Sequence, residues 1–268
     1  MPVAILLADT VTRLGAEHAG QVLVAGSHGG IVAAAYAAEA GVRAAVFNDA
    51  GRGCDDAGVA GLAALQDAGI AAVAVAHTSA RIGDAADALA GGIVSVCNAS
   101  AAACGVVPGM SCHEAARRLL AAPWRRGIVA VAAGTRVLLA PQEPGCAPVR
   151  GLDSIGLVEP ADAGAVLVIG SHGALHGGDP ESALGVAARA AFFHDAGRGK
   201  DDAGITRLPV LAARAMPAAA VDYRSARIGD ARSLWDTGIL SVVNALAAAR
   251  GVAPGMRVAA AALLLRRD

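Results

Sequence analysis

Residues 22–29 read Val-Leu-Val-Ala-Gly-Ser-His-Gly, and residues 166–173 read Val-Leu-Val-Ile-Gly-Ser-His-Gly. Four apolar residues followed by glycine are typical of a buried strand that ends in a turn. The two stretches differ only at Ala25 and Ile169, so the chain contains an internal repeat in which His28 and His172 occupy equivalent positions.

Three further motifs recur in the same order and mark the extent of the repeat. Asp-Ala-Gly-Arg-Gly stands at 49–53 and 195–199, Asp-Asp-Ala-Gly at 55–58 and 201–204, and Ser-Ala-Arg-Ile-Gly-Asp-Ala at 79–85 and 225–231. Several prolines punctuate the stretch between the repeats, which favours a linker. We therefore predict a first α/β repeat at 1–122, a linker at 123–150 with a hairpin from Ile128 to Leu139, and a second α/β repeat at 151–268.

Within the first repeat, short apolar runs alternate with alanine-rich segments. The apolar runs predict buried strands at 22–25, 44–47, 71–76 and 93–96, and the alanine-rich segments predict helices at 31–40, 59–68, 85–89 and 111–120. Strand and helix in alternation imply right-handed βαβ crossovers. The predicted fold class is therefore α/β, with two tandem βα repeats that form parallel, doubly wound (Rossmann-like) sheets related by a pseudo-two-fold axis.

The composition favours a protein that acts on a small molecule. Hydrophobic residues make up 55% of the 268 residues but aromatics only 3%, so Ala, Val, Leu and Ile must build the core. The formal net charge is -1 without long runs of one sign, which argues against nucleic-acid and membrane partners. Alanine-rich segments with few charges, such as 31–40, suit a subunit interface, so we expect a homo-oligomer.

The N-terminal stretch and the cysteines indicate a cytoplasmic protein. The apolar stretch at 3–8 is too short for a signal peptide or a membrane span, and no basic residues precede it. All five cysteines lie in the first 146 residues, without a Cys-x-x-Cys pair and without counterparts in the second repeat. This usage is typical of reduced thiols.

The shared motifs each follow a predicted strand, where ligands bind in open α/β sheets. Ser27 and His28, with Ser171 and His172 in the second repeat, place a hydroxyl and an imidazole at this edge. A histidine there can act as a general acid or base. The alternative is that each histidine only hydrogen-bonds a neighbouring loop.

The Asp-Ala-Gly-Arg-Gly turn adds a carboxylate, Asp49 or Asp195, and a guanidinium. Its arginine can hold a substrate carboxylate or phosphate through two parallel hydrogen bonds, or it can pair with the aspartate and fix the turn. The same alternatives apply to the Ser-Ala-Arg motif, where Asp84 is expected to cap the next helix. The expected substrate-binding residues are Ser27, Ser171, Arg52, Arg198, Ser79, Arg81, Ser225, Arg227 and Tyr223.

Positions at which the repeats differ suggest a division of labour. Asn48 corresponds to His194, Cys54 to Lys200, and His77 to Tyr223, and Lys200 is the single lysine of the chain. An amine beside the turn can serve as a base or as a point charge. The second repeat is therefore expected to carry the dominant site, with catalytic candidates His28, His172, Asp49, Asp195, Lys200 and His194.

These groups favour an enzyme that hydrolyses a C–N bond in a small anionic or amide-bearing metabolite. One alternative is a two-base isomerase or racemase that uses His28 and His172, and another is a protein that binds a small anion without catalysis. The sequence lacks HExxH, GxGxxG and Walker motifs, so we expect no metal and no cofactor.

Overall fold

A computed structural model describes residues 2–130 and 134–267. Within these residues the chain divides into two compact units. The first comprises residues 2–52, 56–130 and 199–203, and the second comprises residues 53–55, 134–198 and 204–267. Each unit thus includes a short segment from the opposite repeat, and this segment begins at the last glycine of the Asp-Ala-Gly-Arg-Gly turn.

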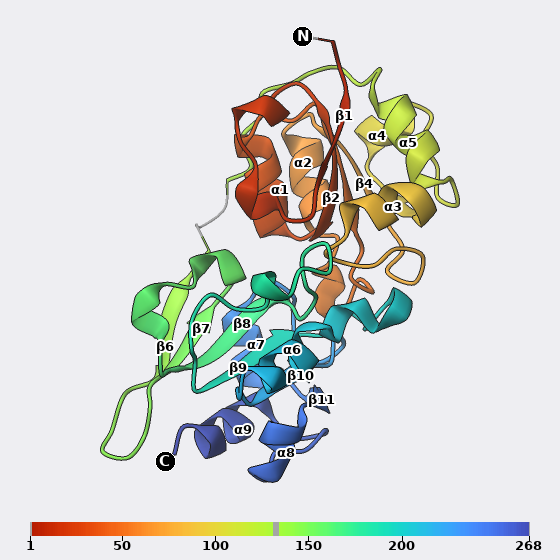
Figure 1. Ribbon diagram of the computed structural model, residues 1–268. Helices are drawn as coiled ribbons and strands as arrows, with labels where there is room; N and C mark the ends of the chain where they lie inside the picture. The colour runs from red at the N-terminus through yellow and green to blue at the C-terminus, as the bar shows by residue number, and fades with distance from the viewer. Residues whose placement is uncertain (1, 131–133, 268) are drawn as a thin grey trace. The chain divides into compact units, whose positions relative to one another are not determined.

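The first unit is a five-stranded sheet in the order β1-β2-β3-β4-β5, with helices on both faces (Figure 1). The first four strands pair in parallel, and β5 is antiparallel to β4. Its elements are β1 (Ile5–Ala8), β2 (Val22–His28), α1 (Ile31–Glu39), β3 (Ala44–Asn48), α2 (Gly61–Asp67), β4 (Ala71–Val75), α3 (Ala85–Gly91), β5 (Val94–Cys97), α4 (Ala99–Ala103) and α5 (Cys112–Leu119).

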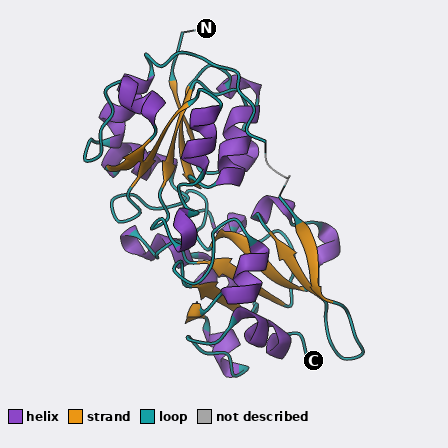
Figure 2. Ribbon diagram, turned by 180° about the vertical axis from the view of Figure 1, so that it is seen from behind, coloured by secondary structure: helices purple, strands orange, loops and turns teal. Residues whose placement is uncertain are grey.

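Alternate residues of the central strands supply two separate cores in this unit. Leu23 and Phe47 pack against α1 and α2, whereas Val24, Val46 and their neighbours on the opposite face pack against α3 and α5. Figure 1 shows α1 and α2 on one side of the strands and α3 to α5 on the other, and Figure 2 shows the same layers from behind. Because β2, β3 and β4 are buried on both faces, their sequences are apolar without alternation.

The second unit is a six-stranded sheet in the order β11-β10-β9-β8-β7-β6. The pairs β7–β8, β8–β9 and β9–β10 are parallel, and the two outer pairs are antiparallel. Its elements are β6 (Arg136–Ala140), β7 (Val149–Leu152), β8 (Val166–His172), β9 (Ala190–His194), α6 (Arg207–Ala213), β10 (Ala218–Val221), α7 (Ala231–Thr237), β11 (Leu240–Val243), α8 (Ala245–Ala249) and α9 (Val258–Leu265).

The second unit differs from the first where α1 would stand. Residues 173–189 form a loop that contains only one short 3-10 helix, Pro180–Ser182. Gly61 and Arg207 hold equivalent positions, because their N–H groups donate to the carbonyls of Gly29 and Gly173 at 2.9 and 2.8 Å. A Cβ on Gly61 would lie 2.7 Å from the Ala34 side chain of α1, so the first unit needs glycine there.

The α/β class is confirmed, with mixed sheets that are mostly parallel and helices between strands. The antiparallel β5 differs from the expected all-parallel sheet. Ala76 donates its N–H to the Ile93 carbonyl at 2.8 Å, so β5 starts at the edge where β4 ends and must run back along it. The strand order also advances without the reversal that creates a crevice in doubly wound sheets.

Three local features complete the comparison with the sequence. The strand β1 and the helix α4 are additional to the elements expected in the first repeat. The expected hairpin from Ile128 to Leu139 includes residues 131–133, which lie outside the described residues, and β6 pairs instead with β7. Among residues 2–130 and 134–267, no helix combines the length and apolar character that crossing a membrane requires.

A close backbone approach fixes the end of β2. A Cβ on Gly26 would lie 2.6 Å from the Gly83 carbonyl carbon and 2.7 Å from Asp84 N and from Asp9 O. Gly26→Ala should therefore lower the free energy of unfolding by about 1–3 kcal/mol, measured by urea denaturation. Gly185→Ala is the control, because its Cβ meets nothing within 4 Å; equal stability of the two variants would contradict the prediction.

Candidate active site at the carboxyl edge of the first unit

A carboxylate and an imidazole meet where β3 and β4 of the first unit end. Asp49 follows β3, and its Oδ1 accepts the backbone N–H of His77 at 2.8 Å and lies 3.1 Å from His77 Nδ1. The Asp49 side chain is 6% exposed and that of His77 is 23% exposed. With the Nδ1 proton donated to the carboxylate, Nε2 becomes the basic nitrogen of His77.

The Asp49 carboxyl is held in its charged form. Burial raises its pKa, but hydrogen bonds from His77 and from the Gly51 N–H outweigh burial, so the pKa lies below its ordinary value. A charged carboxylate that orients an imidazole is the arrangement that general-base catalysis uses.

The turn after Asp49 is strained. Ala50, Gly51, Arg52 and Gly53 have φ values of 51°, 72°, 63° and 69°, and their counterparts in the second repeat have 52°, 70°, 60° and 70°. A left-handed conformation costs a non-glycine residue about 1–2 kcal/mol. Hydrogen bonds from Ala50 N to Asn48 Oδ1 and from Arg52 N to Asp49 O hold the turn nonetheless. Such strain clusters at functional sites.

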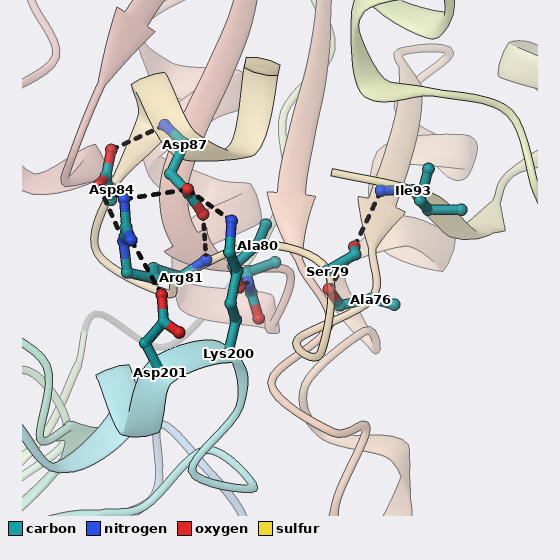
Figure 3. Close-up of polar contacts among 10 residues, drawn as sticks. Ala76, Ser79, Ala80, Arg81, Asp84, Asp87, Ile93, Lys200 and Asp201 are labelled. Carbon is teal, nitrogen blue, oxygen red and sulfur yellow. Dashed lines mark hydrogen bonds and ion pairs between the residues drawn. The ribbon is translucent and has the colours of Figure 1, made fainter. Parts of the chain in front are cut away.

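Lys200 belongs to the first unit and lies beside His77. Its backbone N–H donates to the His77 carbonyl at 2.8 Å. Its Nζ donates to Asp87 Oδ1 at 2.7 Å, as Figure 3 shows. Burial raises the pKa of Asp87. The hydrogen bonds from Lys200 and from the Arg81 backbone N–H, together with the charge of Arg81, lower it below the ordinary value. Lys200 is therefore held as a partner of a carboxylate beside the candidate site.

A second ion pair anchors the same segment. Arg81 Nη1 donates to Asp201 at 2.9 Å, and its Nη2 lies 3.0 Å from Asp87 and 3.4 Å from Asp84 (Figure 3). Together with Lys200 these residues comprise two cations and three carboxylates, so the group has no excess of positive charge. Arg81 fixes the segment 199–203 rather than offering an open clamp for an anion.

The other expected arginines also lie in defined surroundings. Arg52 pairs with Asp56 at 2.8 Å, and Arg227 of the second unit pairs with Asp55 at 2.7 Å. Asp55 and Asp56 have positive φ and make these ion pairs, and neither side chain caps α2. Arg198 lies in the left-handed turn of the second unit at φ 60°.

The four expected serines all bond to backbone groups. Ser27 and Ser171 each accept the N–H of the residue sixteen positions earlier. Ser79 and Ser225 each donate to the carbonyl three positions earlier and accept the N–H fourteen positions later, as Figure 3 shows for Ser79. These hydroxyls brace the strand ends.

His28 and His172 repeat one geometry in the two units. They are 8% and 4% exposed, and the Nδ1 of each accepts the backbone N–H two residues later, at 3.1 and 3.3 Å. Acceptance at Nδ1 places the ring proton on Nε2. The two imidazoles thus have the same tautomer and the same local backbone partner.

His194 replaces Asn48 with the same two hydrogen bonds. Asn48 donates to the Ala80 carbonyl and accepts the N–H two residues later, at 3.0 and 2.9 Å. His194 donates from Nε2 to the Ala226 carbonyl and accepts the N–H two residues later, both at 3.1 Å. Burial lowers the pKa of His194 to about 4, so the ring is neutral at pH 7 and serves as a bridge between loops.

Asp195 differs from Asp49 in its partner. Tyr223 stands in place of His77, and Asp195 Oδ1 accepts the backbone N–H groups of Tyr223 and Gly197, at 3.0 and 2.9 Å. Burial raises the pKa of Asp195 above its ordinary value. The pairing of carboxylate with imidazole thus occurs in the first unit, whereas the sequence favoured the second.

Two residues of this site were not among the expected site residues. His77 lies just after β4, the strand that pairs with β3, which Asp49 follows. The sequence signal for His77 was its replacement by Tyr223 in the second repeat. Asp87 corresponds to Ser233, so the Lys200–Asp87 pair of the first unit matches Cys54 and Ser233 in the second. The joint change of both positions was a further signal.

Three observations bear on ligands and relatives. In the described part of the chain, no group of three or more His, Cys, Asp or Glu side chains is arranged to hold a metal ion. A cavity of about 410 Å³ lies at the amino ends of β7 and β8, so it is not at the carboxyl edge of this sheet. Its lining includes Gln142, Glu143, Cys146 and Arg150. Comparison with known proteins finds no matching family model, no similar curated protein and no similar solved structure.

The buried His194 should make stability depend on pH. Its folded pKa of about 4 lies below the ordinary 6.5, so its contribution is complete above pH 6.5 and is lost as the pH falls toward 4. The loss is about 3 kcal/mol. His194→Asn keeps both hydrogen bonds and should remove this loss, measured by urea unfolding at pH 7, 6, 5 and 4. Parallel pH profiles of the two proteins would refute the assignment.

The two buried aspartates should respond oppositely to loss of charge. Asp49→Asn weakens charge-assisted hydrogen bonds and should destabilise the protein by about 1–2 kcal/mol at pH 7. Asp195→Asn removes a charge that burial disfavours and should leave stability unchanged or raise it. Both effects come from ionised carboxyls. The contribution of Asp49 is complete above the ordinary pKa of 3.8 and is lost as the pH falls from 3.8 through its lower folded pKa, so the difference should be smaller at pH 3 than at pH 7. Urea titrations at pH 7 and pH 3 test this, and equal destabilisation at pH 7 would contradict it.

Proposed function

We propose that the protein is an enzyme that hydrolyses a C–N bond in a small amide-bearing metabolite, with Asp49 and His77 as its acid–base pair. The observation that carries the proposal is the contact of 3.1 Å between Asp49 Oδ1 and His77 Nδ1 at the carboxyl edge of the first unit. The lowered pKa of Asp49 supports it, because an ionised carboxylate stabilises the imidazolium that forms when His77 takes a proton.

Water is the nucleophile in this proposal, because the four expected serines bond to the backbone. His77 Nε2 removes a proton from water while the water oxygen bonds to the amide carbon. The same proton then passes to the leaving nitrogen as the C–N bond breaks, which gives a carboxylic acid and an amine. Asp49 holds the ring throughout.

The ion pairs of Arg52, Arg81 and Arg227 favour an amide-bearing substrate over an anionic one, since these guanidiniums already have carboxylate partners. Lys200 acts as a positioning residue here, because it bonds Asp87 through Nζ and the His77 carbonyl through its N–H. Nothing in this assignment requires a second base.

Turnover of a panel of small linear and cyclic amides and ureas, followed by release of ammonia or amine, tests the proposal. His77→Gln should lower kcat/KM by about 10²–10⁴-fold, and Asp49→Asn by about 10²-fold or more. His113→Gln removes an exposed imidazole on α5 and should change kcat/KM by less than about twofold. Full activity of His77→Gln would exclude this mechanism, and tight amide binding without turnover would favour a binding protein.

A further inference from the structure

A buried arginine in the second unit has no carboxylate partner within residues 2–130 and 134–267. Arg207, the first residue of α6, is 0% exposed, and no ion pair joins it to an acidic side chain among the residues that the structure describes. A guanidinium keeps its charge in proteins, and burial without a counter-charge is strongly unfavourable. The charge therefore requires an explanation.

The contacts of Arg207 are made with carbonyl oxygens, an imidazole and an aromatic ring. Nη1 donates to the carbonyls of Ser182 and Ala183, and Nη2 lies 3.2 Å from His176 Nε2. The guanidinium lies 5.6 Å from the centre of the Phe193 ring. Its Nε is buried and has no hydrogen-bond partner among residues 2–130 and 134–267. One donor of the planar edge thus remains unsatisfied.

Holding the loop does not by itself call for a cation. A neutral donor such as glutamine can satisfy carbonyls without bringing a charge inside. Arg214, which directly follows α6, shows the contrast. It donates to the carbonyls of Leu184 and Pro180 and also pairs with Glu181 at 3.2 Å. Arg214 has its counter-charge in the loop, and Arg207 does not.

Two imidazoles lie on the same side of the unit. His176 is half-buried and contacts Arg207 directly, and its ring centre lies 6.0 Å from that of His172 at the end of β8. Two exposed glycines, Gly177 and Gly178, directly follow His176. His176 thus stands between the buried guanidinium and the surface of the unit.

The first unit has no such arrangement, because glycine replaces the arginine at the equivalent position and α1 fills the space of the loop. The buried Arg207 beside His176 is therefore a specific feature of the second unit rather than a consequence of the shared scaffold.

We propose that the second unit binds a small oxyanion, carried as a carboxylate or phosphate group, at Arg207, with His176 as the second contact. The edge formed by Nε and Nη2 matches two oxygens of such a group. The bound anion supplies the missing counter-charge and a partner for Nε. This site is separate from the Asp49–His77 pair and does not depend on catalysis.

Binding of orthophosphate and of succinate to the full chain tests the proposal, by calorimetric titration and by thermal unfolding against chloride at equal ionic strength. At least one of the two should bind the wild type and raise its Tm by about 2 °C or more. Arg207→Gln should weaken that binding tenfold or more. Arg232→Gln removes an exposed arginine on α7 of the same unit and should leave it unchanged.

The response to phosphate alone or to succinate alone identifies the shape of the group. His176→Gln provides a second test should Arg207→Gln fail to fold, since it also should weaken binding by several-fold. The proposal is overturned if neither anion stabilises or binds the wild type beyond chloride, or if Arg207→Gln or His176→Gln binds as tightly as the wild type.

Discussion

A single carboxylate oxygen organises the carboxyl edge of each unit. Oδ1 of Asp49 accepts the N–H of Gly51, which holds the left-handed turn, and the N–H of His77, which fixes the chain after the next strand. Oδ1 of Asp195 does the same with residues 197 and 223. Since a left-handed turn costs energy at each non-glycine residue, the buried carboxylate is the constraint that keeps this edge in place.

Comparison of the two units separates scaffold from chemistry. Asn48 and His194 make equivalent hydrogen bonds with different groups, so this difference preserves a bridge between loops. The change from His77 to Tyr223 alters the partner of the buried aspartate, and with it the direction in which the pKa moves. A difference between the repeats therefore indicates a change in chemistry only where the substituted side chain alters the charge or the pKa of a neighbouring group.

The sequence predicts what depends on local pattern. Continuous apolar runs predict the strands at 22–25 and 44–47. A short polar side chain before a helix predicts that Asp84 caps α3. The antiparallel direction of β5 could not be predicted from the local sequence, because it depends on the contact between Ala76 and Ile93, which turns the chain back along β4. The Lys200–Asp87 pair joins residues 113 positions apart, and no local pattern encodes such a contact.

The Lys200–Asp87 pair also explains why the single lysine of the chain stands where it does. Asp87 Oδ2 accepts the Arg81 N–H, and Ser233 Oγ accepts the Arg227 N–H in the second unit, so both side chains serve the same backbone. Of these two side chains, only Asp87 carries a charge, and it is largely buried. The residue that faces Asp87 is Lys200, whereas the equivalent residue in the other unit is Cys54. The two changes compensate each other, because an unpaired carboxylate at 10% exposure is costly and a lysine without it has no partner. One unit has a charged pair beside His77, and the other has a buried guanidinium to which the described residues offer no carboxylate. These are two independent departures from one scaffold.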